Sequence, residues 1–478
     1  MRNKSLNLLR TAAQCNRVKS QPIGCRNVKY ASRWSSTSTS ATSERQWSTP
    51  LAKTLAEAIT TTGPISVAAY MRQCLTHPEG GYYTRQTSSG QDQFGTKGDF
   101  VTSPEISQVF GELVGIWLYA EWLAQGRREK VQIIEVGPGR GTLMDDVLRT
   151  ISSFKAFTKS IEAIYLWCED IRLVPKEDTA APFILAHEFF DALPIHVFQN
   201  IANSSLPASS TIITPTGPIK PKHGVTTPKN TWHELVVSPT SPYKEPEKPG
   251  QEKLDFELTV SKTPTPHSLY LPSLSDRYKK LENTPDAIIE ISPESLAYIA
   301  DFAVRIGGSN AEVSSSPTSP PSAVSMIPEP FTKSQPSGAA LILDYGPSST
   351  IPANTLRGIR SHTTVSPFAS PGLVDLSADV DFLALADTAL SASPGVEVHG
   401  PVEQSFFLST MGIKERADRL LSAAKDEETR SRLETGWKRL VDRGPNGMGK
   451  TYKALAIVPY KEKGPVRRPI GFGGDLVG

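Results

Sequence analysis

Two repeating patterns of apolar residues run along the chain and predict its secondary structure. Mostly apolar runs of six to eight residues are typical of buried strands, and they fall at residues 131–136, 161–168, 182–187, 339–344 and 452–458. Apolar residues spaced three and four apart predict amphipathic helices at residues 51–62, 65–76, 106–123, 293–306, 376–390, 402–409 and 413–440. Strands that alternate with helices in this way are typical of an α/β fold with a mainly parallel sheet.

Shorter apolar runs and polar stretches divide the chain further. Runs at 195–199, 232–237 and 256–260 are predicted as antiparallel additions to the fold. Segments rich in Pro, Ser, Thr and Lys predict mobile insertions at 204–250 and 308–337. We therefore expect a helical region with a long glycine-rich loop at 51–125, a main domain at 126–459 and a tail at 460–478.

A glycine-rich turn after the first long apolar run indicates a ligand site. Glu135 lies near the end of that run, and Gly137, Gly139 and Gly141 precede the next helix. Glycines let the backbone approach a ligand closely, and the free N–H groups that open a helix favour an anion. NAD is disfavoured because Thr142 stands where a dinucleotide fingerprint has its third glycine. Acid-x-Gly-x-Gly instead resembles motif I of class I S-adenosylmethionine (SAM) methyltransferases; a glycine turn without a ligand is the alternative.

A second candidate site follows the apolar run that ends at His187. The sequence continues with Glu188, two phenylalanines and Asp191. Polar side chains directly after a parallel strand lie at the carboxyl edge of the sheet, where open α/β sheets bind their ligands. We therefore expect these three side chains to share a site with the glycine turn.

The distribution of charge points to a cellular compartment. The whole chain carries a formal net charge of only +2, yet residues 1–43 contain eight Lys or Arg and no Asp or Glu. An Arg-rich, Ser-rich and acid-free start is typical of a mitochondrial transit peptide, predicted here at 1–45. A disordered basic tail is the alternative.

Several classes of protein are disfavoured by what the sequence lacks. The sequence contains no run of eighteen apolar residues, so no transmembrane segment is predicted. Cys74 and Cys168 are isolated, without the pairing of a disulfide framework or of a zinc site, so we expect no metal. Basic residues outside the first 43 are mixed with acidic ones, which gives nucleic-acid binding little support.

Six segments, in the order in which they occur, resemble one known family. The MidA family of mitochondrial and bacterial methyltransferases has segments similar in sequence to GGYYT (80–84), GDFVTSPEISQVFGELVGIW (98–117), EVGPGRGTLMDD (135–146), LAHEFFDALP (185–194), LILDYG (341–346) and SPGLVDLSADVDF (370–382). The resemblance covers residues 64–459, apart from the Pro/Ser-rich insertions. It implies a Rossmann-like class I SAM methyltransferase fold with an N-terminal helical extension.

The resemblance also implies an activity. Eukaryotic members of this family are mitochondrial complex I assembly factors that symmetrically dimethylate an arginine on a core subunit of the matrix arm, using SAM. We therefore expect a SAM-dependent protein arginine N-methyltransferase of the mitochondrial matrix whose partner is such a subunit. This agrees with the predicted transit peptide.

The resemblance assigns roles to individual residues. Two groups of residues are expected to bind SAM. The loop that closes over the cofactor would consist of Thr102, Ser103, Pro104 and Glu105, and the residues that line the SAM site would be Glu135, Gly137, Gly139, Arg140 and Gly141. His187, Glu188 and Asp191 would face the transferred methyl group. A carboxylate can hold a guanidinium by paired charge-assisted hydrogen bonds, so we assign Glu188 as the clamp, with Asp191 or His187 supporting it or taking the proton. The alternative is that His187 and Asp191 only cap a helix or bond to the backbone.

One segment departs from the family pattern. In SAM methyltransferases the second strand ends in an acid that holds the ribose, and a helix and a third strand follow. Here only residues 168–181 separate Trp167 from Pro182. A single parallel crossover already takes a dozen or more residues, so the third strand is predicted to be missing, which would expose a new sheet edge. Glu169 or Asp170 could replace the ribose acid; a solvated loop charge is the alternative.

Three other functions stay open on sequence grounds. The missing segment is compatible with a catalytically impaired, methyltransferase-like assembly chaperone. A small-molecule methyltransferase would instead have a closed apolar pocket, and a nicotinamide dehydrogenase is the least favoured reading. Divergence, alternative splicing and a sequence error would each leave the same gap.

Overall fold

A computed structural model describes residues 45–85, 102–166, 168, 170–202, 212–214, 217–219, 230–241, 253–309, 330–462 and 467–473. Residues Trp47–Gly478 form one compact unit. Nearly all of the predicted transit peptide, residues 86–101 of the predicted glycine-rich loop, and Glu169 lie outside the described residues. No helix of the described part of the chain is long and apolar enough to cross a membrane.

The central element is a six-stranded sheet in the order β15-β16-β11-β4-β2-β3. The first four strands along the chain run parallel, and the last two pair antiparallel. Their bounds are β2 (Val131–Val136), β3 (Ile161–Tyr165), β4 (Ala181–His187), β11 (Ala339–Tyr345), β15 (Val396–Glu403) and β16 (Tyr452–Pro459). The mainly parallel sheet agrees with the alternation of apolar runs and helical patterns in the sequence.

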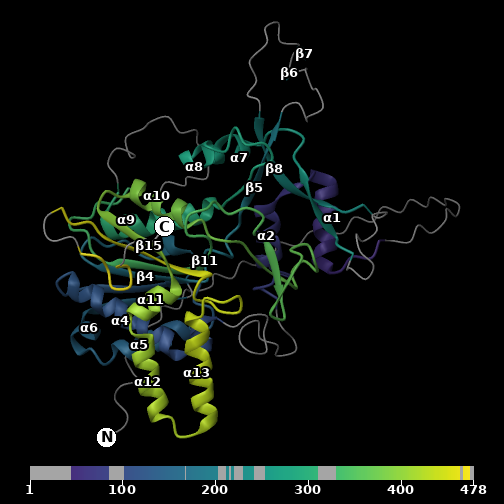
Figure 1. Ribbon diagram of the computed structural model, residues 1–478. Helices are drawn as coiled ribbons and strands as arrows, with labels where there is room; N and C mark the ends of the chain where they lie inside the picture. Colours follow the sequence, from purple (N-terminus) through teal and green to yellow (C-terminus); the bar gives the residue numbers. More distant parts are fainter. Residues whose placement is uncertain are drawn as a thin grey trace, which may run out of the picture. The chain divides into compact units, whose positions relative to one another are not determined.

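Helices cover both faces of this sheet (Figure 1). Side chains alternate across each strand, so Val131 and Ile133 of β2 pack in one apolar core and Ile134 in another. The first core contains the helices α4 (Gln108–Ala124), α5 (Thr142–Ile151), α11 (Gln404–Thr410), α12 (Ile413–Ala423) and α13 (Glu427–Val441). The second contains α9 (Pro293–Gly307) and α10 (Phe382–Ala392). This three-layer arrangement buries the strands on both faces and explains why they are mostly apolar.

As predicted from the sequence, no third strand follows β3 among the described residues, and β3 forms the end of the sheet. Among the described residues no strand pairs with its outer edge. The chain crosses from β3 to β4 through a short connection whose described residues contain only the 3-10 helix η1 (Ile171–Leu173). Buried Arg305 of α9 holds that connection, because its guanidinium donates to the carbonyls of Ile171 at 2.7 Å and Val174 at 2.9 Å while pairing with Asp301.

A second, antiparallel sheet has the order β1-β8-β5-β10, with β9 paired to β8. The predicted antiparallel additions at 195–199, 232–237 and 256–260 are thus confirmed, and β8 crosses the segment predicted as a mobile insertion. One apolar core joins this sheet to the first two helices. The bounds are α1 (Pro50–Thr62), β1 (Ile65–Ser66), α2 (Val67–Thr76), β5 (His196–Ala202), β8 (Asn230–Pro239), β9 (Phe256–Val260) and β10 (Ile288–Ile291).

Three helix predictions began too early. In the one at 65–76, Ile65 and Ser66 form strand β1 and α2 starts at Val67. Residues 375–377 form strand β14, which pairs with β12, and α10 starts only where Asp381 accepts a hydrogen bond from the Ala384 N–H. Val402 and Glu403 end β15, so α11 starts at Gln404. The remaining elements are α3 (Ser103–Ile106), α6 (Lys155–Ser160), β6 (Ile212–Thr214), β7 (Gly217–Ile219), α7 (Pro266–Tyr270), η3 (Leu271–Ser273), α8 (Asp276–Lys279), β12 (Arg357–Arg360), β13 (Thr363–Val365) and β14 (Asp375–Ser377).

Candidate active site

A cavity of about 1350 Å³ opens at the carboxyl ends of β2, β4 and β11. Its wall combines the glycine turn after β2, the turn after β4, and residues of α2 and of the three-stranded sheet β13-β12-β14. Sites for one drug-sized molecule occupy roughly 300–1,000 Å³. The cavity is therefore large enough for a nucleoside cofactor together with a substrate side chain.

The glycine turn brings the backbone to the cavity wall. Gly137 has φ 64°, and a Cβ built on it would lie 2.7 Å from Cδ2 of Phe189. Gly141 has φ 82° and is the N-cap residue directly before α5. Both positions require glycine, the first because of the close ring and the left-handed backbone, the second because of the backbone alone.

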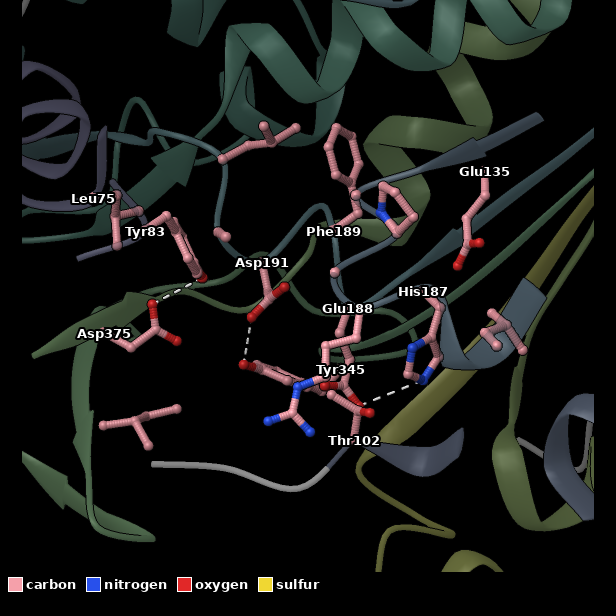
Figure 2. Close-up of a pocket in the computed structure, with 18 of the residues that line it drawn as sticks. Leu75, Tyr83, Thr102, Glu135, His187, Glu188, Phe189, Asp191, Tyr345 and Asp375 are labelled. Atoms are coloured by element: carbon pink, nitrogen blue, oxygen red, sulfur yellow. Dashed lines mark hydrogen bonds and ion pairs between the residues drawn. The ribbon is translucent and has the colours of Figure 1, made fainter. Parts of the chain in front are cut away.

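Glu135 ends β2 beneath this turn with a carboxyl group that faces the cavity (Figure 2). The residue is only 6% exposed, and its Oε2 has no hydrogen-bond partner among the described residues. Burial raises the pKa of Glu135 to about 7. A buried acceptor of this kind needs a ligand donor, preferably a cationic one, to offset its loss of water.

The turn after β4 presents Glu188 in an unusual backbone conformation. Glu188 has φ 48°, in the left-handed region that is costly for a non-glycine residue. Its N–H donates to the Leu343 carbonyl at 3.0 Å. The fully buried Asp344 carboxyl accepts from the N–H groups of Phe189 at 3.1 Å and Phe190 at 2.9 Å. Asp344 at the end of β11 therefore positions the Glu188 turn.

The Glu188 carboxyl is buried and only partly satisfied. Burial raises its pKa to about 8, and the nearby Asp191 adds to the shift. The Tyr452 side chain and the Ser103 backbone act in the opposite direction by hydrogen bonding to the carboxyl. Its Oε1 has no hydrogen-bond partner among the described residues and lies 3.4 Å from Nε2 of His187. The group is thus prepared to accept hydrogen bonds from a cationic ligand.

His187 cannot form an ion pair with Glu188 at neutral pH. Burial lowers the pKa of the imidazole to about 3. Its ring packs edge-on against Phe110, with the centroids 5.1 Å apart. A neutral imidazole with so low a pKa is a poor proton acceptor, so the geometry favours Glu188 over His187 for that role.

Asp191 is held by residues from two other elements. The Tyr345 hydroxyl at the end of β11 donates to its Oδ2, and that hydroxyl lies 2.6 Å from Oγ of Ser377 on β14. Arg357 lies over the Tyr345 ring, 4.8 Å from its centroid. Burial raises the pKa of Asp191, while the Tyr345 hydrogen bond and Arg357 oppose the shift. Its Oδ1 has no hydrogen-bond partner in the described part of the chain, so a second acceptor faces the cavity.

The predicted closing segment lies beside the glycine turn. The Thr102 N–H donates to Oε2 of Glu105 at 3.1 Å in a capping box that starts α3. Oε1 of Glu105 lies 3.3 Å from Nη1 of Arg140, which joins this segment to the turn. Pro104 also lines the cavity, whereas Ser103 and Gly141 do not. Ser103 is instead completely buried behind the wall.

Several cavity residues carry no signal of their own in the sequence. The Tyr83 hydroxyl donates to Oδ1 of Asp375 at 2.9 Å on the side opposite the glycine turn (Figure 2). Tyr345, Arg357 and Tyr452 complete this half of the wall. Tyr83 and Tyr345 lie in segments that resemble the family, but only their hydrogen bonds to acids distinguish them from core tyrosines.

The end of β3 contributes nothing to the cavity among the described residues. Asp170, a candidate for holding the ribose, instead binds Nε of Arg172 with both carboxylate oxygens at 2.9 Å. Its orientation is therefore accounted for by a local ion pair. The other candidate, Glu169, lies outside the described residues.

Comparison with known proteins gives a family match. The model of a family of S-adenosyl-L-methionine-dependent methyltransferases matches residues 113–166 and 163–402. The two matched stretches overlap at residues 163–166, at the end of β3 and directly before the short connection to β4. The interruption of the match thus coincides with the missing strand.

Curated relatives resemble the chain over most of its length. The protein arginine methyltransferase NDUFAF7, mitochondrial, of Rattus norvegicus is 32% identical and covers 86% of this chain and 85% of its own. The Homo sapiens protein of the same name is 31% identical, with 86% and 84% covered. The Drosophila melanogaster homolog is also 31% identical, with 86% and 85% covered.

Solved structures with a similar fold come from Burkholderia thailandensis. One protein, crystallised with S-adenosyl-homocysteine, superposes with a TM-score of 0.57 at 18% identity and covers 89% of this chain and 93% of its own. A native structure from the same organism gives a TM-score of 0.54, with 90% and 94% covered. The predicted Rossmann-like methyltransferase fold is thereby confirmed.

Proposed function

This chain belongs to the family of S-adenosyl-L-methionine-dependent methyltransferases, and we propose that it methylates an arginine side chain of a protein substrate in mitochondria. One observation favours arginine as the side chain that is methylated. Two buried carboxyl groups, Glu188 and Asp191, line one cavity, and each has an oxygen without a hydrogen-bond partner among the described residues. A guanidinium supplies several donors in a planar fork that matches such acceptors.

The residues of the glycine turn fit SAM. Glu135 offers a buried, unsatisfied carboxyl oxygen to a cationic amino group, and Gly137 and Gly139 present backbone without side chains beside it. Arg140 and Glu105, 3.3 Å apart, would close that end of the cavity. When bound, SAM supplies a methyl group on a positively charged sulfur. Its charge also favours the ionised forms of the surrounding carboxyl groups.

The carboxyl groups would orient and activate the guanidinium. Glu188 and Asp191 would accept hydrogen bonds from its nitrogens and draw its positive charge away from the attacking nitrogen. That nitrogen must lose a proton, and Oε1 of Glu188 is the acceptor that the geometry favours because its pKa of about 8 is close to neutrality. The Tyr345 hydroxyl and the Asp344 carboxyl keep the two acids in place.

The compartment and the partner are supported by the relatives. The rat, human and fly proteins are each named mitochondrial, and residues 1–43 of this chain have the composition of a transit peptide. On this basis we assign the protein to the mitochondrial matrix. Its substrate is then a core subunit of the matrix arm of complex I, on which it forms symmetric dimethylarginine.

The missing segment after β3 favours one competing function, an assembly chaperone without catalysis. No described residue of the β3–β4 connection lines the cavity, so the usual ribose acid has no counterpart among those residues. Calorimetric titration of the full chain with SAM separates the two functions. Binding supports the methyltransferase, whereas no detectable binding would refute it.

A transfer assay tests the role of the acids. Mitochondrial extract incubated with radiolabelled SAM should be labelled by the wild type and at least 100-fold more slowly by Glu188→Gln, which keeps the size of the side chain but removes its charge. The matched control is Glu79→Gln, an exposed glutamate that does not line the cavity. Equal labelling by Glu188→Gln and Glu79→Gln would contradict the assignment of Glu188.

A further inference from the structure

Three side chains from separate elements meet at the second sheet, and none of them is among the residues that line the cavity. His196 opens β5, Glu234 lies in β8, and His267 lies in α7. Each can offer one ligand atom, and these atoms all lie within 4.8 Å of one another. We propose that these three residues bind a divalent transition-metal ion of the zinc class.

The distances are close to those of a metal site. Nδ1 of His196 lies 2.6 Å from Oε1 of Glu234, and Nδ1 of His267 lies 4.0 Å from Oε2 of the same carboxylate. Around a tetrahedral Zn²⁺ with bonds of about 2.0–2.1 Å, neighbouring ligand atoms are about 3.3 Å apart. The two distances run to different oxygens of the carboxylate, while one ligand atom of each residue lies within 4.8 Å of the others. A bound metal would therefore draw the His267 ring inward and separate His196 slightly from Glu234.

Hydrogen bonding alone does not account for the position of His267. The position of His196 is explained by its hydrogen bond with Oε1 of Glu234, and the position of Thr265 by its hydroxyl, which donates to Oε2 of Glu234 at 2.5 Å. Nδ1 of His267 is beyond hydrogen-bond distance at 4.0 Å. Yet its ring centroid is only 4.2 Å from that of His196. A cation between the two imidazoles and the carboxylate would use all three groups.

The charge of the cluster also favours a bound cation. The Glu234 side chain is only 2% exposed, and among the described residues its ion-pair partners are the two imidazoles alone, with no lysine or arginine. A buried carboxylate is costly unless a positive charge compensates it. A bound dication would supply that charge while the imidazoles stay neutral, the form in which they bind metals.

The donor set selects the kind of metal. Two imidazole nitrogens and one carboxylate oxygen suit Zn²⁺ and its neighbours, whereas Mg²⁺ and Ca²⁺ prefer oxygen ligands. The Thr265 hydroxyl would orient the carboxylate from outside the coordination shell. His267 is 53% exposed in its side chain, so a fourth position filled by water would face solvent. The ion would tie α7 to the sheet strands β5 and β8.

Calorimetry with ZnCl₂ on the chelator-treated full chain tests this site. We expect one Zn²⁺ per chain for the wild type, and binding at least tenfold weaker for His267→Gln, whose exposed position should leave folding intact. The matched control is His362→Gln, an exposed histidine of the β12–β13 turn, which should bind as the wild type does.

A second measurement identifies the ligands. Co²⁺ in place of Zn²⁺ should give the visible absorption of a four-coordinate site in the wild type and in His362→Gln but not in His267→Gln. Circular dichroism establishes that each variant is folded. No binding to the wild type, or equal binding to the two variants, would overturn the proposal.

Discussion

Replacing Gly137 by alanine should block the proposed cofactor site through a neighbouring ring. An added Cβ would lie 2.7 Å from Cδ2 of Phe189, whereas carbon atoms in contact are about 3.5–4.0 Å apart. The ring, which lines the cavity, must therefore move by about 1 Å or the turn must open. The left-handed backbone at φ 64° adds about 1–2 kcal/mol of strain, and overpacking adds about 1–3 kcal/mol.

Gly126→Ala separates the steric effect from the backbone strain. Gly126 also has a left-handed backbone, at φ 84°, but nothing lies within 4 Å of its added Cβ. We expect Gly126→Ala to lower the free energy of unfolding by only about 1–2 kcal/mol and to leave the dissociation constant for SAM unchanged. Gly137→Ala should weaken SAM binding at least tenfold, or about 1.4 kcal/mol, in calorimetry.

The comparison of these two variants can refute the reasoning. Urea unfolding measures the stability of each one, and calorimetry is performed only under conditions where both are folded. Equal affinity for SAM in the two variants would show that the Phe189 ring does not limit the cavity. The glycine turn would then need another explanation.

Three further predictions concern the acids and the connection after β3. Burial raises the pKa of Glu188 from 4.5 to about 8, so the stability that the protonated group contributes is fully present below pH 4.5 and is lost as the pH rises through 8. The free energy of unfolding should therefore fall with pH more steeply in the wild type than in Glu188→Gln. Tyr345→Phe removes the hydroxyl that donates to Asp191, and urea unfolding should show a loss of about 1–3 kcal/mol, with slower methyl transfer but unchanged SAM affinity. Arg305→Met removes the donor to three carbonyls of the connection and one of the two cationic partners of Asp301, which keeps Lys176, and should cost at least about 2 kcal/mol; a change below about 1 kcal/mol would contradict its role in holding the β3–β4 connection.

Much of the fold was predictable because its signals are local. The five long strand predictions each overlap a strand of the main sheet, and the missing strand followed from a simple count of residues before Pro182. The errors arose where long-range pairing overrides local pattern. Residues 375–377 pair with β12 and so become a strand, although the same segment continues a helical pattern.

The candidate site was predictable only in part. The glycine turn and the acids after β4 are visible because their residues are consecutive and adjoin a strand end. The groups that hold them come from distant parts of the chain: Asp344 follows Glu188 by more than 150 residues, and Tyr452 lies in the last strand. No periodicity or spacing relates such positions, so only the folded chain reveals them.

The sequence by itself determined the class of fold, the place of the glycine turn and the acids that follow β4. These depend on the order of apolar and polar residues along short segments, which the backbone translates directly into strands, turns and strand ends. The tertiary structure alone decided that Glu188 and Asp191 are buried with unsatisfied oxygens, and that His187 is neutral. It also decided the meeting of His196, Glu234 and His267. The reason is physical: burial and the approach of charged groups depend on which elements pack together, and that is settled only when the whole chain has folded.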